Sequence, residues 1–339
     1  MTMQSATIEN VFIPRVTGLL IIEARNSNPN GDPDRESDPR TRAHDGKGVI
    51  SDVSFKRKLR ELVLKKDGPV WLHLKSTMNL NDDKFGIHVD DNTRKGIQAG
   101  ERVIGELKKV YEKANEIAKK DKTKEAEALA YAAFNAYKTE FCGAHWDVRV
   151  FGSTSLETEV SVIRSGVAQF GIGVSSAKVR IQRDTNTVRA GVDVGKDADR
   201  GMAPLGFRVV EHGVYAMPFL INPTAAKHSG CTLQDIELLC RLIPYAYPHN
   251  ASRVRPMVEV RHAWYFEHKS HLGSASDFKI LDALGPKKED SATPSNEWAD
   301  YGYNADLLKT KIKTEFAGKF NRFADLADER ELEEAFPEK

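Results

Sequence analysis

The stretch from Asn26 to Leu62, with the apolar run in front of it, constrains the fold most, because a strand, a loop and a helix are encoded in direct succession. The run Leu19-Leu20-Ile21-Ile22 is too short to cross a membrane and is typical of a buried strand. The following Asn-Pro-Asn-Gly-Asp-Pro at 28–33 combines three kinds of turn former: proline fixes φ, glycine allows positive φ, and Asn or Asp bonds to the nearby backbone. The sequence therefore predicts a buried strand that ends in a shaped loop.

A helix is predicted directly after this loop. Ser51 is a suitable N-cap, and Asp52 in the first turn favours the helix dipole. Apolar residues recur at i, i+4, i+7 and i+8 and form one buried stripe: Phe55, Leu59, Leu62 and Val63. Three cations gather on another side, namely Lys56, Arg57 and Arg60. Such a patch can contact phosphates while the stripe packs, but a solvated charged face is an equally good interpretation of the spacing.

The middle of the chain is predicted to contain one short strand followed by helices. Val70 to Leu74 alternates in polarity and predicts a short second strand. Residues 101–120 and 126–141 keep a three-to-four apolar spacing and predict an αα-hairpin. We therefore expect a helical insertion over residues 76–145, whose many lysines are more easily explained by solvation than by ligand binding.

From Val148 onward the pattern becomes strand-like. Residues 160–164, 167–181 and 207–221 are rich in β-branched and aromatic residues. Thr232 is a suitable cap for a helix that Pro244 ends, and residues 258–267 alternate as a strand. On that alternation Val258, Val260, His262, Trp264 and Phe266 share one face, and core packing is the expected role of Trp264 and Phe266. The element order is compatible with an α+β, RRM-like (ferredoxin-like) core in a single domain over residues 1–339.

The segment 182–206 separates two of these strands and is polar, glycine-bearing and rich in arginine. It predicts a protruding β-ribbon or loop. Arginines on such a ribbon, here Arg183 and Arg189, can hold phosphate. A surface loop without a partner explains the same composition.

Bulk properties exclude several classes of protein. The 339 residues carry a formal net charge of only +1, so any nucleic-acid site must be a local patch. The three cysteines, Cys142, Cys231 and Cys240, lie far apart and encode neither a disulfide framework nor a cysteine zinc site. We find no signal peptide, membrane span or phosphate-binding loop in the sequence, so we expect a cytoplasmic protein without a cofactor.

Several motifs occur together in a recognisable order. The first is Asn26, Asn28, Pro29, Asn30, Gly31, Asp32 and Pro33, followed by Asp52, Val53, Lys56, Arg57, Lys58, Leu59 and Arg60. Weaker blocks follow at Trp146–Gly152, Gly166–Gln169, Gly213–Tyr215, His249–Arg253 and Ala299–Tyr301. Together they make the chain similar to the repeated backbone subunit of type I CRISPR surveillance complexes (Cascade), of the I-C or I-B type.

The resemblance implies a non-enzymatic protein that oligomerises along the spacer of a CRISPR guide RNA (crRNA) and presents it for pairing with target DNA. It further implies that residues 182–206 form a thumb-like ribbon on a palm domain. Partners would be crRNA, target DNA through the guide, copies of the chain itself and other Cascade subunits, with no membrane. The RNA contacts expected are Asn28, Asn30, Lys56, Arg57, Arg60, Arg149, Arg164, Arg183, Arg189, Met202 and Arg253.

One alternative is of another class. Asp32, Asp34, Asp38 and His44 cluster on a single loop, and carboxylates of this kind can bind a hard cation that activates water for phosphodiester cleavage. A metal-dependent ribonuclease that uses Asp32 and Asp34 is therefore the second hypothesis. Nearby prolines and arginines argue against it, because they favour a rigid turn and neutralise much of the negative charge. Under the first hypothesis we expect neither a bound metal nor a catalytic residue.

Overall fold

The centre of the molecule is an antiparallel sheet of eight strands. The computed structural model describes residues 13–88, 142–155, 162–189 and 202–328. The sheet runs in the order β12-β11-β1-β10-β8-β4, with β7 and β9 also paired to β10. Its strands are β1 Val16–Ser27, β4 Lys47–Ile50, β7 Ala168–Phe170, β8 Gly173–Lys178, β9 Ile181–Arg189, β10 Met202–Ile221, β11 Val258–His268 and β12 Phe320–Asp325. Two small sheets pair β2 Gly31–Asp32 with β3 Asp38–Pro39, and β5 Gly152–Ser155 with β6 Val162–Ser165.

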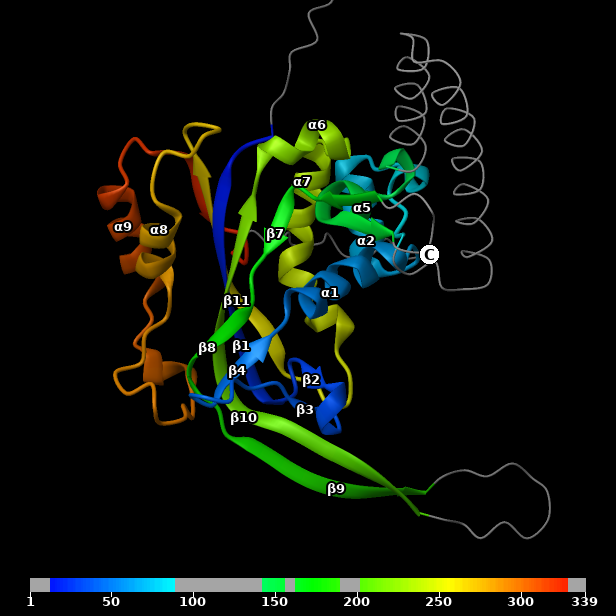
Figure 1. Cartoon of the computed structure of the whole chain (residues 1–339), viewed down its shortest axis with the longest axis vertical. Helices are drawn as coiled ribbons and strands as arrows, with labels where there is room; N and C mark the ends of the chain where they lie inside the picture. Colours follow the sequence, from blue (N-terminus) through cyan, green and yellow to red (C-terminus); the bar gives the residue numbers. More distant parts are fainter. Residues whose placement is uncertain (1–12, 89–141, 156–161, 190–201, 329–339) are drawn as a thin grey trace, which may run out of the picture.

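Helices cover both faces of the large sheet (Figure 1). One face carries α1 Asp52–Leu64, α2 Pro69–Met78, α5 Trp146–Phe151, α6 Ala226–Ser229 and α7 Leu233–Leu242. The other carries α8 Asp277–Leu284 and α9 Ala305–Glu315. The described residues also include short 3₁₀ turns: η1 Pro33–Arg35, η2 Asp82–Lys84, η4 Pro223–Ala225, η5 Ile243–Tyr245, η6 Pro248–Asn250 and η7 Trp298–Tyr301. The resulting layers, helices on each side of one sheet, place a separate apolar core on each face.

The larger core confirms the helix predicted after the loop. Helix α1 begins at Asp52, with the Ser51 side chain accepting a hydrogen bond from the Ser54 amide at 3.2 Å. All four residues of the expected stripe are buried in the core that α1 shares with α2, α7 and the sheet. Helix α7 is likewise capped as predicted, by a box in which Thr232 and Asp235 bond reciprocally.

The smaller core lies under α8 and α9. Trp264 and Phe266 are fully buried there against Ile280 and Leu284, which confirms that they are packing residues. The predicted face of β11 is nevertheless wrong. Where β11 pairs with β1, the register shifts between Ile21 and Ile22, so that Arg261 has no partner in β1.

This bulge reverses the alternation along β11. Val258 and Val260 belong to the larger core, as do Ala263 and Tyr265 after the bulge, whereas Trp264 and Phe266 turn to the smaller core. The inserted residue therefore decides which of the two cores each later side chain of β11 enters. A sequence pattern of strict period two cannot show such a shift.

One predicted strand is a helix, and the strand-like region after Val148 begins with another. Residues 70–74 lie in α2, where Gly68 is the N-cap and Pro69 occupies the first turn. Val70, Trp71 and Leu74 are all buried, because the spacing i, i+1, i+4 places them on one helical face. The strand-like pattern expected from Val148 likewise begins only after α5, which ends at Phe151. Five or six residues are too few to distinguish the helical period of 3.6 residues from the strand period of two.

A two-stranded ribbon extends from the sheet. Strand β9 pairs with residues 202–210 of β10 and projects with it from the bottom of the sheet (Figure 1). Elsewhere, the described residues end at His88 and resume at Cys142, and a backbone bridge joins Gly86 to His145 close to these two points. The αα-hairpin predicted over residues 101–141 lies outside the described residues. None of the helices in the described ranges is long and apolar enough to cross a bilayer.

Candidate nucleic-acid interface

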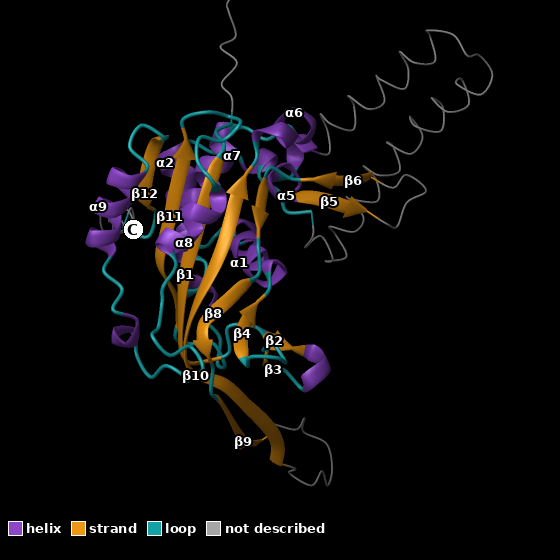
Figure 2. Cartoon of the chain, turned by 60° about the vertical axis from the view of Figure 1, so that its left-hand side comes forward, coloured by secondary structure: helices purple, strands orange, loops and turns teal. Residues whose placement is uncertain are grey.

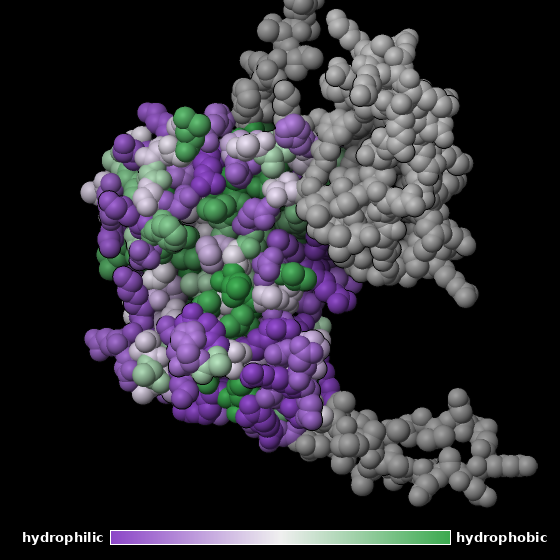
Figure 3. Space-filling model, viewed as in Figure 1, coloured by the Kyte–Doolittle hydropathy of each residue, from purple (hydrophilic) through white to green (hydrophobic). Residues whose placement is uncertain are grey.

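Several of the predicted binding residues come from three segments that lie on the same side of the molecule. These are the loop over residues 28–40, which contains β2, η1 and β3, the first turns of α1, and the base of the β9/β10 ribbon (Figure 1, Figure 2). The described surface over the loop and the ribbon base is mainly hydrophilic (Figure 3). We call these three segments the loop face.

Asn28 and Asn30 shape the loop. Asn28 is buried, and its Nδ2 donates to the Ser37 carbonyl at 2.8 Å across the loop. Asn30 Oδ1 accepts a hydrogen bond from the Ser51 amide at 2.8 Å, directly at the N-cap of α1. The Asn28 carbonyl also accepts from Arg255 Nε at 2.9 Å. The two asparagines therefore join the loop to α1 and to the chain near residue 255.

The three cations of α1 differ in their surroundings. The Arg57 side chain is 69% exposed and pairs with Glu61 at 2.8 Å, one turn along the helix. Lys56 pairs with Asp52 at 2.9 Å and is largely covered. Arg60 donates from Nε to the buried carboxylate of Asp147 at 3.0 Å.

Aromatic packing accounts for this difference. The Arg60 guanidinium carbon lies 5.0 Å and Lys56 Nζ 6.0 Å from the centre of the Phe151 ring. Both side chains therefore turn toward α5, and the expected open patch of three cations becomes one open cation, Arg57, beside two that are packed.

Lys58 is a cation that the sequence reasoning did not single out. It is buried, and Glu61 Oε2 lies 3.7 Å from its Nζ. Burial lowers the pKa of Lys58, and the nearby charge of Arg255 lowers it further. Helical spacing could have revealed this, because position 58 is three residues after Phe55 and four before Leu62 on the buried stripe.

The base of the ribbon is fastened to the loop through Asp38. Arg183 of β9 donates from Nε and Nη2 to Asp38 Oδ2 at 2.9 and 2.8 Å. Arg208 of β10 donates to the other oxygen at 3.1 Å and also pairs with Glu36. Hydrogen bonding to Arg183 lowers the pKa of Asp38 and outweighs the opposing effect of desolvation, and the bond to Arg208 adds to the lowering. We call Asp38, Arg183 and Arg208 the ribbon clamp.

The structure does not support Arg149 as an RNA contact. Its guanidinium is buried and forms a two-bond ion pair with Asp235, at 3.0 and 2.7 Å. The remaining donors reach the carbonyls of Lys84, Cys142 and Gly143, at 2.8 to 2.9 Å. Arg149 therefore holds together the two points at which the segment 89–141 leaves and rejoins the fold. Its carboxylate partner Asp235 lies 86 residues along the chain, so no local pattern around Arg149 indicates this role.

The remaining predicted contacts are spread over several elements. Arg253 is exposed in the connection that follows η6. Arg164 lies in β6 opposite Ser153. Arg189 and Met202 pair with each other at the outer end of the described ribbon. The structure thus brings Asn28, Asn30, Lys56, Arg57 and Arg183 to the loop face and leaves Arg164 and the end of the ribbon elsewhere.

The acidic loop residues do not converge as a metal site would require. Asp32 pairs with Arg40 at 3.3 Å, Asp38 belongs to the ribbon clamp, and His44 lies beside Asp45. Among the described residues, no three His, Cys, Asp or Glu side chains are grouped closely enough to hold a metal ion. The geometry therefore gives no support to the nuclease hypothesis.

Comparison with known proteins identifies the chain's relatives. A curated relative named CRISPR-associated protein Cas7, from Haloferax volcanii, is 23% identical over 237 residues, which is 65% of this chain and 60% of the relative. Two solved chains, both named as belonging to CRISPR RNA-guided surveillance complexes and one of them pre-nicking, share 13% identity. They match with TM-scores of 0.47 and 0.41 and cover 89% and 94% of this chain, and 89% and 95% of their own length. The family CRISPR-associated protein Cas7 matches residues 14–306, and the chain therefore belongs to the Cas7 family.

Proposed function

We propose that this chain is a guide-RNA-binding backbone subunit of a CRISPR surveillance complex. Several copies would lie along the spacer of a crRNA and present it for pairing with target DNA, next to other Cascade subunits. The chain's membership of the Cas7 family is the observation that carries this proposal. The loop face, where predicted contacts from distant parts of the sequence meet, is the surface we assign to the RNA.

The charges of the loop face suit a ligand with a phosphate backbone. Arg57 and Arg40 each have a carboxylate partner, yet more than a third of each side chain is exposed. Exposed ion pairs contribute only about 0.2–1 kcal/mol, so exchanging a carboxylate for a phosphate costs little. Phosphate contacts position a strand without reading its sequence, which suits a protein that must hold any spacer.

The arrangement of strands supports an RRM-like palm. The elements β1, α1, β8, β10, α7 and β11 follow one another along the chain, and their strands lie side by side in the order β11-β1-β10-β8. This is the order of a ferredoxin-like sheet with its two crossing helices. In the same proposal, the β9/β10 ribbon is the thumb that contacts the guide bound to a neighbouring copy.

The proposed role needs no catalysis. The chain would hold and order the guide while any cutting is done by other proteins. The pairing of Asp32 and Asp38 with arginines supports this part of the proposal, because a carboxylate already neutralised by arginine attracts a hard cation less strongly.

A titration onto single-stranded RNA tests the proposal. The purified chain is added, in magnesium, to end-labelled RNAs of increasing length, and mobility and strand integrity are read on parallel gels. We expect a ladder of discrete shifted species that lengthens with the RNA, while the RNA stays intact. Cleavage that Asp32→Asn abolishes would replace the proposal with the nuclease hypothesis, and the absence of any shift would remove both.

The same assay tests the loop face directly. Arg57→Ala should lower affinity equally for all sequences and reduce the salt slope by about 0.7 for the lost phosphate contact. Arg241→Ala is the matched control, because Arg241 forms the same kind of i, i+4 pair with Glu237 on α7, away from the loop face. An equal loss of affinity in both variants would show that the effect is not specific to the loop face.

A further inference from the structure

The base of the ribbon carries two arginines directly opposite each other. Arg183 of β9 and Arg208 of β10 are register partners, so both side chains leave the same face of the ribbon. Like charges at opposite positions repel and destabilise a strand pair. The structure offsets this repulsion with a carboxylate that belongs to the neighbouring loop (Figure 1).

Asp38 bridges the two arginines and uses one oxygen for each. Its Oδ2 accepts hydrogen bonds from Nε and Nη2 of Arg183 at 2.9 and 2.8 Å, and its Oδ1 accepts from Nη1 of Arg208 at 3.1 Å. The Asp38 side chain is only 14% exposed. Hydrogen bonding to Arg183 lowers the pKa of Asp38, so the carboxylate remains ionised at neutral pH. One carboxylate therefore fixes two guanidinium groups side by side.

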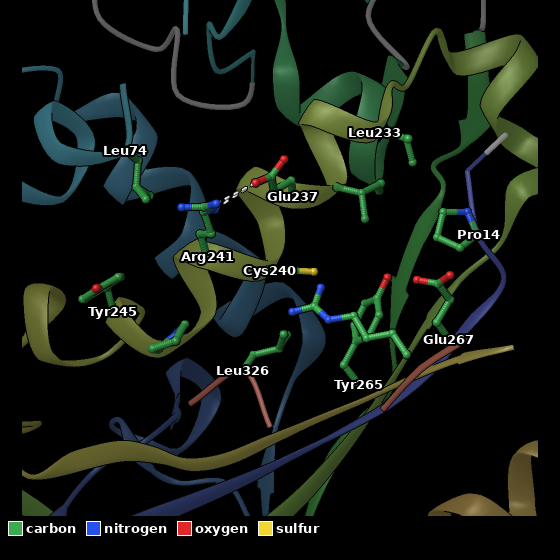
Figure 4. A pocket seen from close by; sticks show the side chains of 13 residues that line it. Pro14, Leu74, Leu233, Glu237, Cys240, Arg241, Tyr245, Tyr265, Glu267 and Leu326 are labelled. Carbon is green, nitrogen blue, oxygen red and sulfur yellow. Dashed lines mark hydrogen bonds and ion pairs between the residues drawn. The ribbon is translucent and has the colours of Figure 1, made fainter. Parts of the chain in front are cut away.

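An arginine beside a carboxylate is often simply neutralised. The cavity of about 370 Å³ between α7 and β11 contains such a case, because Arg241, which lines it, donates to Glu237 of the same helix at 2.7 Å (Figure 4). One carboxylate meets one arginine in that pair. At the ribbon base a single largely buried carboxylate serves two arginines, so a positive charge remains after the repulsion is offset.

Both arginines keep capacity for another anion. Glu36 also pairs with Arg208, but the Glu36 side chain is 80% exposed, and exposed ion pairs contribute little free energy. Arg183 is 57% exposed, and within the described ranges its Nη1 has no hydrogen-bond partner. A phosphate can therefore replace Glu36 and reach Arg183 while both arginines stay attached to Asp38.

The ribbon surface beside this pair is shallow. Gly206 lies two residues before Arg208, so it shares the same face of β10 but has no side chain. A Cβ placed at Gly206 would meet, among the described atoms within 4 Å, only Arg208 Nε at 3.7 Å. The two guanidinium groups are therefore approachable from the direction of Gly206.

We propose that Asp38 is a positioning residue, which presents Arg183 and Arg208 as a paired binding site for one phosphate of the guide RNA. Guanidinium groups that are already held in place lose little side-chain freedom on binding, so preorganisation increases affinity. The inference rests on the proposed RNA-binding function and adds Asp38 and Arg208 to it. Its consequence is that a negatively charged residue strengthens the binding of a negatively charged ligand.

Two substitutions separate positioning from simple electrostatics, because each removes one negative charge from Arg208. Asp38→Asn loosens both arginines, whereas Glu36→Gln removes only the exposed partner of Arg208. Binding to end-labelled single-stranded RNA is measured by gel shift over a range of salt concentrations. We expect Asp38→Asn to weaken binding about two- to fivefold for each bound copy and to reduce the salt slope by about 0.7, the value for one lost phosphate contact. Glu36→Gln should leave the affinity unchanged or raise it.

Asp38→Asn is also tested in a chain that already carries Arg183→Ala and Arg208→Ala. A positioning residue has nothing left to position there, so we expect no further change in affinity or salt slope. A further loss in that chain would show that Asp38 only stabilises the loop, and would overturn the proposal.

The single variants also give results that would overturn the proposal. Binding by Asp38→Asn as tight as that of the unsubstituted chain, or equal losses in Asp38→Asn and Glu36→Gln, would refute the positioning role and leave the proposed function standing. Absence of RNA binding by the unsubstituted chain would instead refute the proposed function itself.

Discussion

Asp38 accepts two hydrogen bonds from Arg183, at 2.9 and 2.8 Å, across 145 residues of sequence. This contact joins the β2-η1-β3 loop to the base of the ribbon, and Arg208 reinforces it from the neighbouring strand. Two elements assigned to RNA binding are therefore mechanically connected before any RNA is present. The direction of the ribbon depends on a carboxylate that belongs to the loop.

Asp38→Asn should loosen the ribbon base while the sheet stays intact. Two partly exposed ion pairs are weakened, each worth about 0.2–1 kcal/mol, so amide exchange in residues 181–189 should accelerate by roughly two- to thirtyfold. Hydrogen exchange read by mass spectrometry measures this change. Asp34→Asn, an exposed neighbour in the same loop, should leave exchange unaltered, and a similar acceleration in both variants would dismiss the ribbon clamp.

Arg149→Ala should be strongly destabilising. It leaves the Asp235 carboxylate buried without its cation, and removing one partner of a buried pair typically costs about 3–5 kcal/mol. Denaturant unfolding followed by circular dichroism measures the loss. Arg57→Ala, which removes an exposed cation, should change the free energy of unfolding by less than about 0.5 kcal/mol. Comparable losses in the two variants would refute the structural role of Arg149.

Glu23 should make stability depend on acid pH. Burial alone raises its pKa, but hydrogen bonds with His212 and Arg25 and the charges of Arg25 and Arg261 outweigh it and lower the pKa from 4.5 to about 2. A lowered folded pKa stabilises the protein above pH 4.5, and this contribution, at most about 3 kcal/mol, disappears as the pH falls from 4.5 to 2.

The variant Glu23→Gln isolates this effect from that of other carboxylates. We expect the free energy of unfolding of the unsubstituted protein to fall more steeply than that of the variant between pH 5 and pH 3. Parallel curves would mean that Glu23 has an ordinary pKa in the folded state.

Residues 89–141 should be replaceable without loss of the fold. Their flanks are held together by the Gly86–His145 bridge and by Arg149, so a linker of about six Gly and Ser residues can close the chain. We expect a melting temperature within a few degrees of that of the unsubstituted protein, measured by calorimetry. Adding Arg149→Ala should unfold the shortened chain, whereas failure of the shortened chain by itself would show that the segment contributes to the core.

Local patterns were sufficient for some elements and not for others. The apolar run of β1, the capped stripe of α1 and the Thr232 cap of α7 all depend on residues within about ten positions of one another, and the structure confirms them. The strand predicted for residues 70–74 was wrong, because so short an alternation fits both a strand and one helical face. Periodicity cannot decide such cases without knowing which side is buried.

The candidate site shows the same limit. The Arg57 side chain is exposed, as predicted. Arg60 instead pairs with Asp147 and Arg149 with Asp235, carboxylates that lie 87 and 86 residues away in the sequence. Nothing near an arginine in the sequence tells whether a distant carboxylate will neutralise it. For the same reason Asp38 looks like a metal ligand in the sequence, since Arg183 and Arg208 reach it only in the folded chain.

The bulge at Arg261 sets which face of the sheet each later residue of β11 points to. Downstream of it, every side chain depends on one extra residue to face its proper layer, including the two large rings of Trp264 and Phe266. Removing that single residue would turn both rings toward the wrong core, although every other letter of the strand is preserved. The number of residues at this position is therefore more tightly constrained than the type of residue. A related protein could replace Arg261 by another residue more easily than delete it.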